Sequence, residues 1–148
     1  MDIFIKWVKY YKNIRKTKFP NLQIEIEVSC KVNPTESYDI IIKSISSLLE
    51  GINLEFKYGD RIIGKSKNLE VLNIIYNQAR DRYITSVLRR LLLSNLYEYS
   101  TWFYVNKQVA TKGIMVLVED ESESPLGPIR IDLKSNNIER VIEWLCPE

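Results

Sequence analysis

Residues 22–32 alternate strictly between apolar and polar side chains, and this pattern constrains the fold more than any other part of the sequence. The apolar positions are Leu22, Ile24, Ile26, Val28 and Cys30, and the polar positions are Gln23, Glu25, Glu27, Ser29 and Lys31. A period of two places all the apolar side chains on one face of an extended strand. The sequence therefore predicts a half-buried strand, with one face toward a core and the other toward solvent.

Helical and extended patterns interleave along the rest of the chain. A helix is expected at 38–49, where Asn33-Pro34-Thr35-Glu36 offers an N-cap and first turn and Gly51 offers a stop. Further strands are expected at 52–57, 61–65, 97–105, 114–118 and 129–133, a bent helical region from about 66 to 92, and a closing helix at 138–145. Tyr58-Gly59-Asp60 is a hairpin signal. The predicted fold class is α+β, a two-layer sandwich of one mixed or antiparallel sheet with helices packed on one face.

The N-terminal leader differs in charge from the rest of the chain. Residues 1–20 hold six basic residues and one acidic residue, a local net charge of +5, whereas the whole chain carries +2. Their apolar residues fall on one helical face, which predicts a basic amphipathic helix ahead of a single domain at 21–148. Three roles remain open for this helix: docking on the domain, contacting RNA, or lying on an anionic membrane surface. No apolar run approaches the ~20 residues of a membrane span, and a cytoplasmic protein is expected.

The chain contains no histidine, and its two cysteines, Cys30 and Cys146, lie far apart. Without CxxC spacing or histidine the cysteines do not form a recognisable zinc site; they are either buried thiols or a disulfide. The acidic run at 119–123 is interpreted as a solvated edge rather than a metal site, because consecutive carboxylates do not easily converge on one ion. The commonest general base at neutral pH is absent, as are a glycine-rich phosphate loop and a nucleophile elbow. We therefore expect neither catalysis nor a cofactor.

Two segments of the C-terminal half carry a resemblance to a known family. Residues 106–113 (NKQVATKG) form a basic turn that leads into a strand, and residues 123–129 (ESPLGPI) form a rigid corner that opens another. Together they resemble archaeal uncharacterised protein family 0201. Arg82-Tyr83-Ile84 and Arg89 also match a stretch of that family, although Ser86 stands where the family usually has aspartate. The resemblance covers roughly residues 22–148 and implies the fold of the large-subunit ribosomal protein that binds 5S rRNA.

The candidate RNA-binding residues share a basic or carboxamide side chain within residues 80–112. They are Arg80, Arg82, Arg89, Arg90, Lys107, Gln108 and Lys112. A guanidinium pairs bidentately with phosphate and stacks on bases, and a lysine with a nearby carboxamide can hold a phosphate or a 2′-hydroxyl. The competing interpretation is structural: surface ion pairs for the arginines, and a helical turn for the segment at 106–112.

Non-catalytic binding of structured RNA, such as rRNA or tRNA, is the favoured function. The alternative is a protein-interaction module, a homodimer formed through the sheet face or an exposed strand edge. The near-neutral domain and the aromatic stretch at 99–104 favour that alternative. Convergence of the cations on one open face would distinguish RNA binding from burial of aromatic surface against a second copy.

Overall fold

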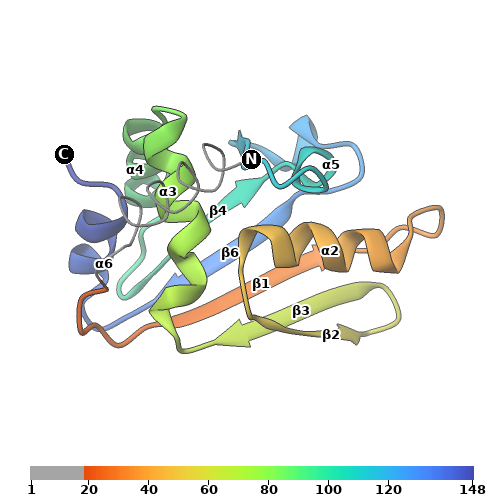
Figure 1. Cartoon of the computed structure of the whole chain (residues 1–148), viewed down its shortest axis with the longest axis horizontal. Helices are drawn as coiled ribbons and strands as arrows, with labels where there is room; N and C mark the ends of the chain where they lie inside the picture. Colours follow the sequence, from red (N-terminus) through yellow and green to blue (C-terminus); the bar gives the residue numbers. More distant parts are fainter. Residues whose placement is uncertain (1–18) are drawn as a thin grey trace, which may run out of the picture.

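The computed structural model describes residues 19–148, so the predicted leader helix lies outside the described residues. Six antiparallel strands form one sheet in the order β2-β3-β1-β6-β4-β5 (Figure 1). The strands are β1 (Glu25–Lys31), β2 (Asn53–Lys57), β3 (Arg61–Ser66), β4 (Ser100–Val105), β5 (Leu117–Val118) and β6 (Ile129–Lys134). The helices are α2 (Tyr38–Leu48), α3 (Asn73–Asp81), α4 (Thr85–Ser94), α5 (Lys107–Ala110) and α6 (Ile138–Leu145), with 3-10 turns at Leu69–Leu72 and Glu121–Glu123.

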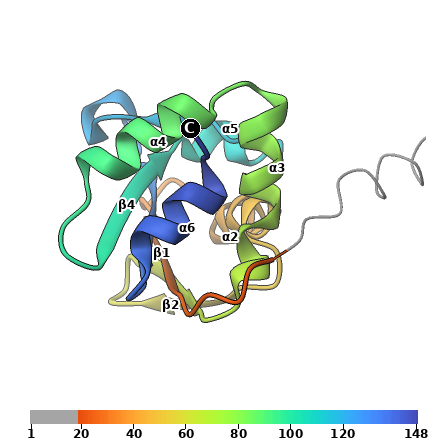
Figure 2. The ribbon, with the colours of Figure 1, turned by 90° about the vertical axis from the view of Figure 1, so that its left-hand side faces the viewer.

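The helices cover one face of the sheet, which confirms the predicted α+β class (Figures 1 and 2). Strand β1 lies between β3 and β6, and its Ile26, Val28 and Cys30 are each at most 1% exposed. The neighbouring strands present Ile62 and Ile131 to the same core. The alternate side chains of β1 point to the other face, which no helix of the described residues covers, as the period of two requires.

The structure differs from the sequence-based expectation in the cap of α2, the length of β5 and a break in the second helical region. Helix α2 begins at Tyr38, as expected, but its N-cap is Ser37 rather than Asn33, because Asn33 closes a turn with Glu36. The strand expected at 114–118 shrinks to two residues, since the Met115 N–H donates to the Gln78 side chain, 2.8 Å away. The helical region at 66–92 is interrupted at residues 82–84.

The two cysteines are free and buried, which is the first of the two interpretations left open by the sequence. Cys30 lies on the covered face of β1, and Cys146 is the C-cap of α6. Burial raises the pKa of the Cys30 thiol to about 11 and that of Cys146 to about 12.

A buried ammonium group joins the end of β1 to the turn before α2 and the loop before β6. Lys107, at the start of α5, is 2% exposed and donates to the Lys31 carbonyl (2.9 Å), the Leu126 carbonyl (2.6 Å) and the Glu36 carboxylate (2.8 Å). Asn33 donates to the Leu126 carbonyl as well, at 2.8 Å. A buried charge is tolerated only when it is paired and fully hydrogen-bonded, and Lys107 meets both conditions.

Replacing Lys107 with methionine is expected to lower the free energy of unfolding by about 3 kcal/mol, because it removes one partner of a buried ion pair. Urea unfolding at pH 7 measures the change. Lys112→Met, an exposed lysine of the same segment, is the matched control and should change stability by less than about 0.5 kcal/mol. Equal effects of the two substitutions would contradict a structural role for the Lys107 ammonium.

The pH dependence of stability should report the Glu36 carboxylate. Burial alone would raise its pKa, but hydrogen bonds from Lys107 and Asn33 hold it below the ordinary value of 4.5. A lowered folded-state pKa contributes stability that is complete above the ordinary value and is lost as pH falls through the folded-state value. The difference in unfolding free energy between the wild type and Glu36→Gln should be constant from pH 6 to 8 and shrink below about pH 4. If the difference in unfolding free energy did not change with pH, the Glu36 carboxylate would not be a source of the pH dependence.

Candidate nucleic-acid interface

Helix α3 and the segment after α5 are joined by the side chain of Gln78. Its Nε2 donates to the Gly113 carbonyl at 2.5 Å, and its Oε1 accepts from the Met115 N–H at 2.8 Å. Arg82, the C-cap of α3, lies about one helical turn beyond Gln78, and Lys112 directly precedes Gly113. The Gln78 side chain therefore joins the middle of α3 to the segment that follows Lys112.

The seven candidate residues separate into two groups by exposure. Arg82, Gln108 and Lys112 are exposed to solvent, and Arg90 is 59% exposed while forming an ion pair with Glu119. These four side chains present donors at the surface.

Arg80 and Arg89 are engaged at the C-terminal end of α6. Arg80 donates to the carbonyls of Trp144 and Leu145, both at 3.2 Å, and its guanidinium lies 3.3 Å from the centre of the Tyr76 ring. Arg89 donates to the Cys146 carbonyl and to Glu143, both at 2.8 Å. Unpaired carbonyls and the negative end of the helix dipole favour cations at this position. These two arginines, like the buried Lys107, have internal partners, and their contact with RNA stays a prediction.

The uncovered face of the sheet carries residues that sequence reasoning did not select. Strand register places Arg130 of β6 between Tyr104 of β4 and Ser29 of β1. The Arg130 guanidinium bonds Asp132 at 3.1–3.2 Å and lies 4.5 Å from the centre of the Trp102 ring. Burial alone would lower the pKa of Arg130, but the bonds and charge of Asp132 raise it. The polar residues at 130, 132 and 134 alternate with apolar ones, so the sequence could have placed Arg130 on the uncovered face. Its aromatic neighbours become apparent only when β6 is paired with β4.

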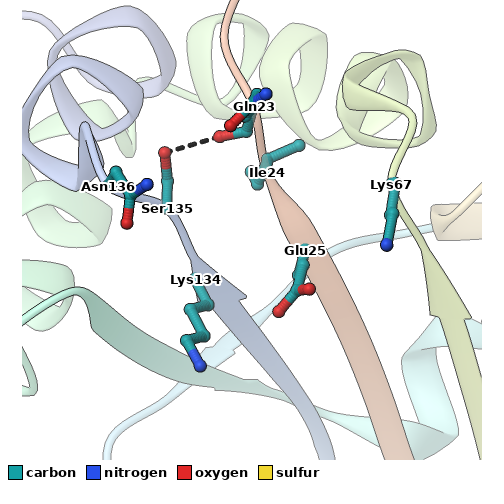
Figure 3. A pocket seen from close by; sticks show the side chains of 7 residues that line it. All are labelled: Gln23, Ile24, Glu25, Lys67, Lys134, Ser135 and Asn136. Atoms are coloured by element: carbon teal, nitrogen blue, oxygen red, sulfur yellow. Dashed lines mark hydrogen bonds between the residues drawn. The ribbon is translucent and has the colours of Figure 1, made fainter.

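Two adjoining hollows lie on this face, and both have mixed charge. Figure 3 shows the smaller one, of about 380 Å³, where Glu25 of β1 lies between Lys67 and Lys134. The larger, of about 660 Å³, extends from these residues toward Arg130. Its lining includes the cations Lys65, Lys67, Arg130 and Lys134 and the carboxylates Glu25, Glu27 and Asp132. Such a near-balanced surface suits a small polar ligand better than a continuous run of phosphates.

Residues 19–148 offer neither a membrane-spanning helix nor a cluster of metal ligands. None of the helices in this range is long and apolar enough to cross a membrane. The same residues contain no group of three or more cysteine, aspartate or glutamate side chains arranged to hold a metal ion. The acidic turn at Glu121–Glu123 instead accepts a hydrogen bond from the Tyr104 hydroxyl to Glu121, at 2.8 Å.

Comparison with known proteins gives consistent matches. The chain is 30% identical over 127 residues to a UPF0201 protein of Sulfurisphaera tokodaii, covering 84% of this chain and 88% of that protein. It is 32% identical over 126 residues to a UPF0201 protein of Thermococcus kodakarensis, covering 83% and 89%. Among solved structures, a UPF0201 protein from Methanococcus jannaschii has a TM-score of 0.71 at 25% identity, covering 84% of this chain and 93% of that one.

A crystal structure of another uncharacterised UPF0201 protein has a TM-score of 0.74 at 27% identity, covering 84% of this chain and 94% of that chain. A family model described as RNA binding matches residues 25–135, a span that includes all seven candidate residues. With the identity to its relatives, the chain belongs to the archaeal UPF0201 family, and the family model that matches it is the one described as RNA binding.

Proposed function

We propose that this protein is a non-catalytic, cytoplasmic RNA-binding protein whose interface is the exposed edge formed by the α3–α4 turn and the α5 turn. Arg82 and Lys112 contact phosphates there, with Gln108 and Arg90 beside them. The RNA is structured, and ribosomal and transfer RNAs are the first candidates. The similarity to the ribosomal protein that binds 5S rRNA, which the family resemblance implies, is part of this proposal.

This choice of site rests on one observation: some of the candidate cations bond to groups inside the protein, and others are exposed to solvent. Arg80, Arg89 and Lys107 donate to internal carbonyls or carboxylates, whereas Arg82 and Lys112 are exposed. The Gln78 bonds join α3, whose C-cap is Arg82, to the segment that follows Lys112.

The uncovered sheet face is the weaker choice on electrostatic grounds. Carboxylates of β1 and β6 stand among its lysines, so a phosphate backbone lying across it would meet Glu25, Glu27 and Asp132. An RNA backbone carries a negative phosphate at every nucleotide, so it binds best to surfaces without carboxylates. At the α3–α4 turn the adjacent carboxylates are Asp81 and the Glu119 that pairs with Arg90, and residues 107–113 contain no carboxylate.

A homodimer is the second candidate, and one observation favours it. Strand β2 pairs only with β3 among the described residues, which leaves its other edge available to a strand of a second copy. Glu55 and Lys57 form an ion pair on β2, and charged side chains on an edge strand oppose such pairing. Molecular mass in solution distinguishes a dimer from a monomer that binds RNA.

The double variant Arg82→Glu/Lys112→Glu is expected to bind RNA at least tenfold more weakly, because two attractions to phosphate become repulsions. The RNA is first recovered by crosslinking and sequencing from cells that express the tagged wild type, then titrated with purified protein. The dependence of log affinity on log salt should become shallower by about 0.7–0.9 for each phosphate that the variant no longer neutralises.

The matched control is Lys57→Glu/Arg61→Glu on the β2–β3 hairpin, which changes net charge by the same amount at exposed positions elsewhere. Its affinity should stay within about twofold of the wild type. Equal losses in the two double variants would assign the effect to overall charge and reject this site. Recovery of no RNA above background would reject the RNA-binding function itself.

A further inference from the structure

Tyr83, in the turn between α3 and α4, has a backbone conformation that favours glycine. Its φ is +55°, in the left-handed region that residues other than glycine rarely adopt. The Ile84 N–H donates to the Ala79 carbonyl at 2.9 Å, and the Tyr83 N–H donates to the Arg80 carbonyl at 3.2 Å. These two bonds are those of a Schellman motif, in which the residue at the Tyr83 position is usually glycine.

The side chain of Tyr83 makes little packing contact that could offset this strain. It is 91% exposed, the highest value among the exposed large hydrophobic residues described. Ile84, the next residue, packs against the core and supplies the apolar contact that accompanies such a motif. The turn would therefore be more stable with glycine at position 83, and folding does not explain a tyrosine there.

Strained residues that the fold does not need often mark a site of function. Tyr83 directly follows Arg82, so an exposed aromatic ring adjoins an exposed cation in the chain, and the Gln78 bonds join α3 to the segment that follows Lys112. An aromatic ring flanked by cations is the arrangement that stacks a nucleobase while the cations hold the adjoining phosphates. Stacking requires a base whose face is accessible, which a base inside a continuous duplex does not offer.

We propose that Tyr83 is a base-stacking residue, and that the RNA bound at the α3–α4 turn presents an unpaired or terminal base to it. This inference rests on the proposed RNA-binding function and narrows its ligand. The ring stacks on the base, Arg82 and Lys112 contact the flanking phosphates, and the Schellman turn fixes the backbone that carries the ring before binding. The selected RNA is thus a hairpin with a bulge or an overhang, rather than an uninterrupted helix.

The test uses two RNA hairpins with the same stem, one fully paired and one with a single bulged uridine, titrated with full-length protein. The wild type should bind the bulged hairpin about tenfold more tightly. Tyr83→Gly should lose this preference and yet raise the Tm by about 2–4 °C, since it relieves the backbone strain. Tyr83→Phe retains the ring and should keep the preference.

Tyr58 provides a control with the same local chemistry. It also has a positive φ (+60°), is 79% exposed and neighbours cations, but it lies on the β2–β3 hairpin. Tyr58→Gly should leave the preference for the bulged hairpin unchanged. If Tyr83→Gly raises the Tm but still prefers the bulged hairpin as the wild type does, Tyr83 does not stack on the base and the inference fails.

The outcomes separate this inference from the function on which it rests. Equal binding of both hairpins by the wild type, still weakened by Arg82→Glu/Lys112→Glu, would overturn the base-stacking role and leave RNA binding in place. Binding of neither hairpin by the wild type would overturn the inference. It would reject the proposed function as well if cellular RNA were also not recovered with the protein.

Discussion

The complete burial of one face of β1 is the constraint on which the rest of the structure depends. Ile26 and Val28 have at most 1% of their surface exposed, and they lie on β1, one of the two central strands of the sheet. A strand buried on one face needs neighbours on both edges and helices above it. Strands β3 and β6 supply the edges, and α2, α3 and α6 contribute Ile45, Ile75 and Ile142 to the same core. The other face of the sheet is left for charged residues.

Cations of this chain serve two physical purposes that residue type alone does not separate. Arg80, Arg89 and Lys107 compensate backbone carbonyls where helices and loops end, positions at which acceptors would otherwise be unpaired. Arg82 and Lys112 sit only a few residues away along the chain and are exposed. Because the structural cations are engaged internally, a basic segment of sequence produces a much smaller basic surface.

Much of the fold could be predicted because its signals are local. The alternation in β1, the hairpin at 58–60 and the apolar spacing of α6 each indicate an element whose position agrees closely with the structure. Strand β5 was predicted too long because the competing partner of Met115 is a glutamine 37 residues earlier in the chain. The break before α4 contains no glycine or proline, and Tyr83 occupies the position at which a glycine would have signalled it. Similarly, the burial of Lys107 depends on Glu36 and Leu126, which only the folded chain brings together.

Both cysteine thiols have low reactivity while the chain is folded. Cys30 faces the core from the central strand and Cys146 closes the last helix, and burial keeps each protonated at neutral pH. The thiolate is the species that reacts with alkylating reagents and oxidants, so little of either cysteine is available to them. A cysteine introduced on the surface would then be the one reactive thiol among the described residues. The natural sequence already serves as a background for attaching a single spectroscopic label.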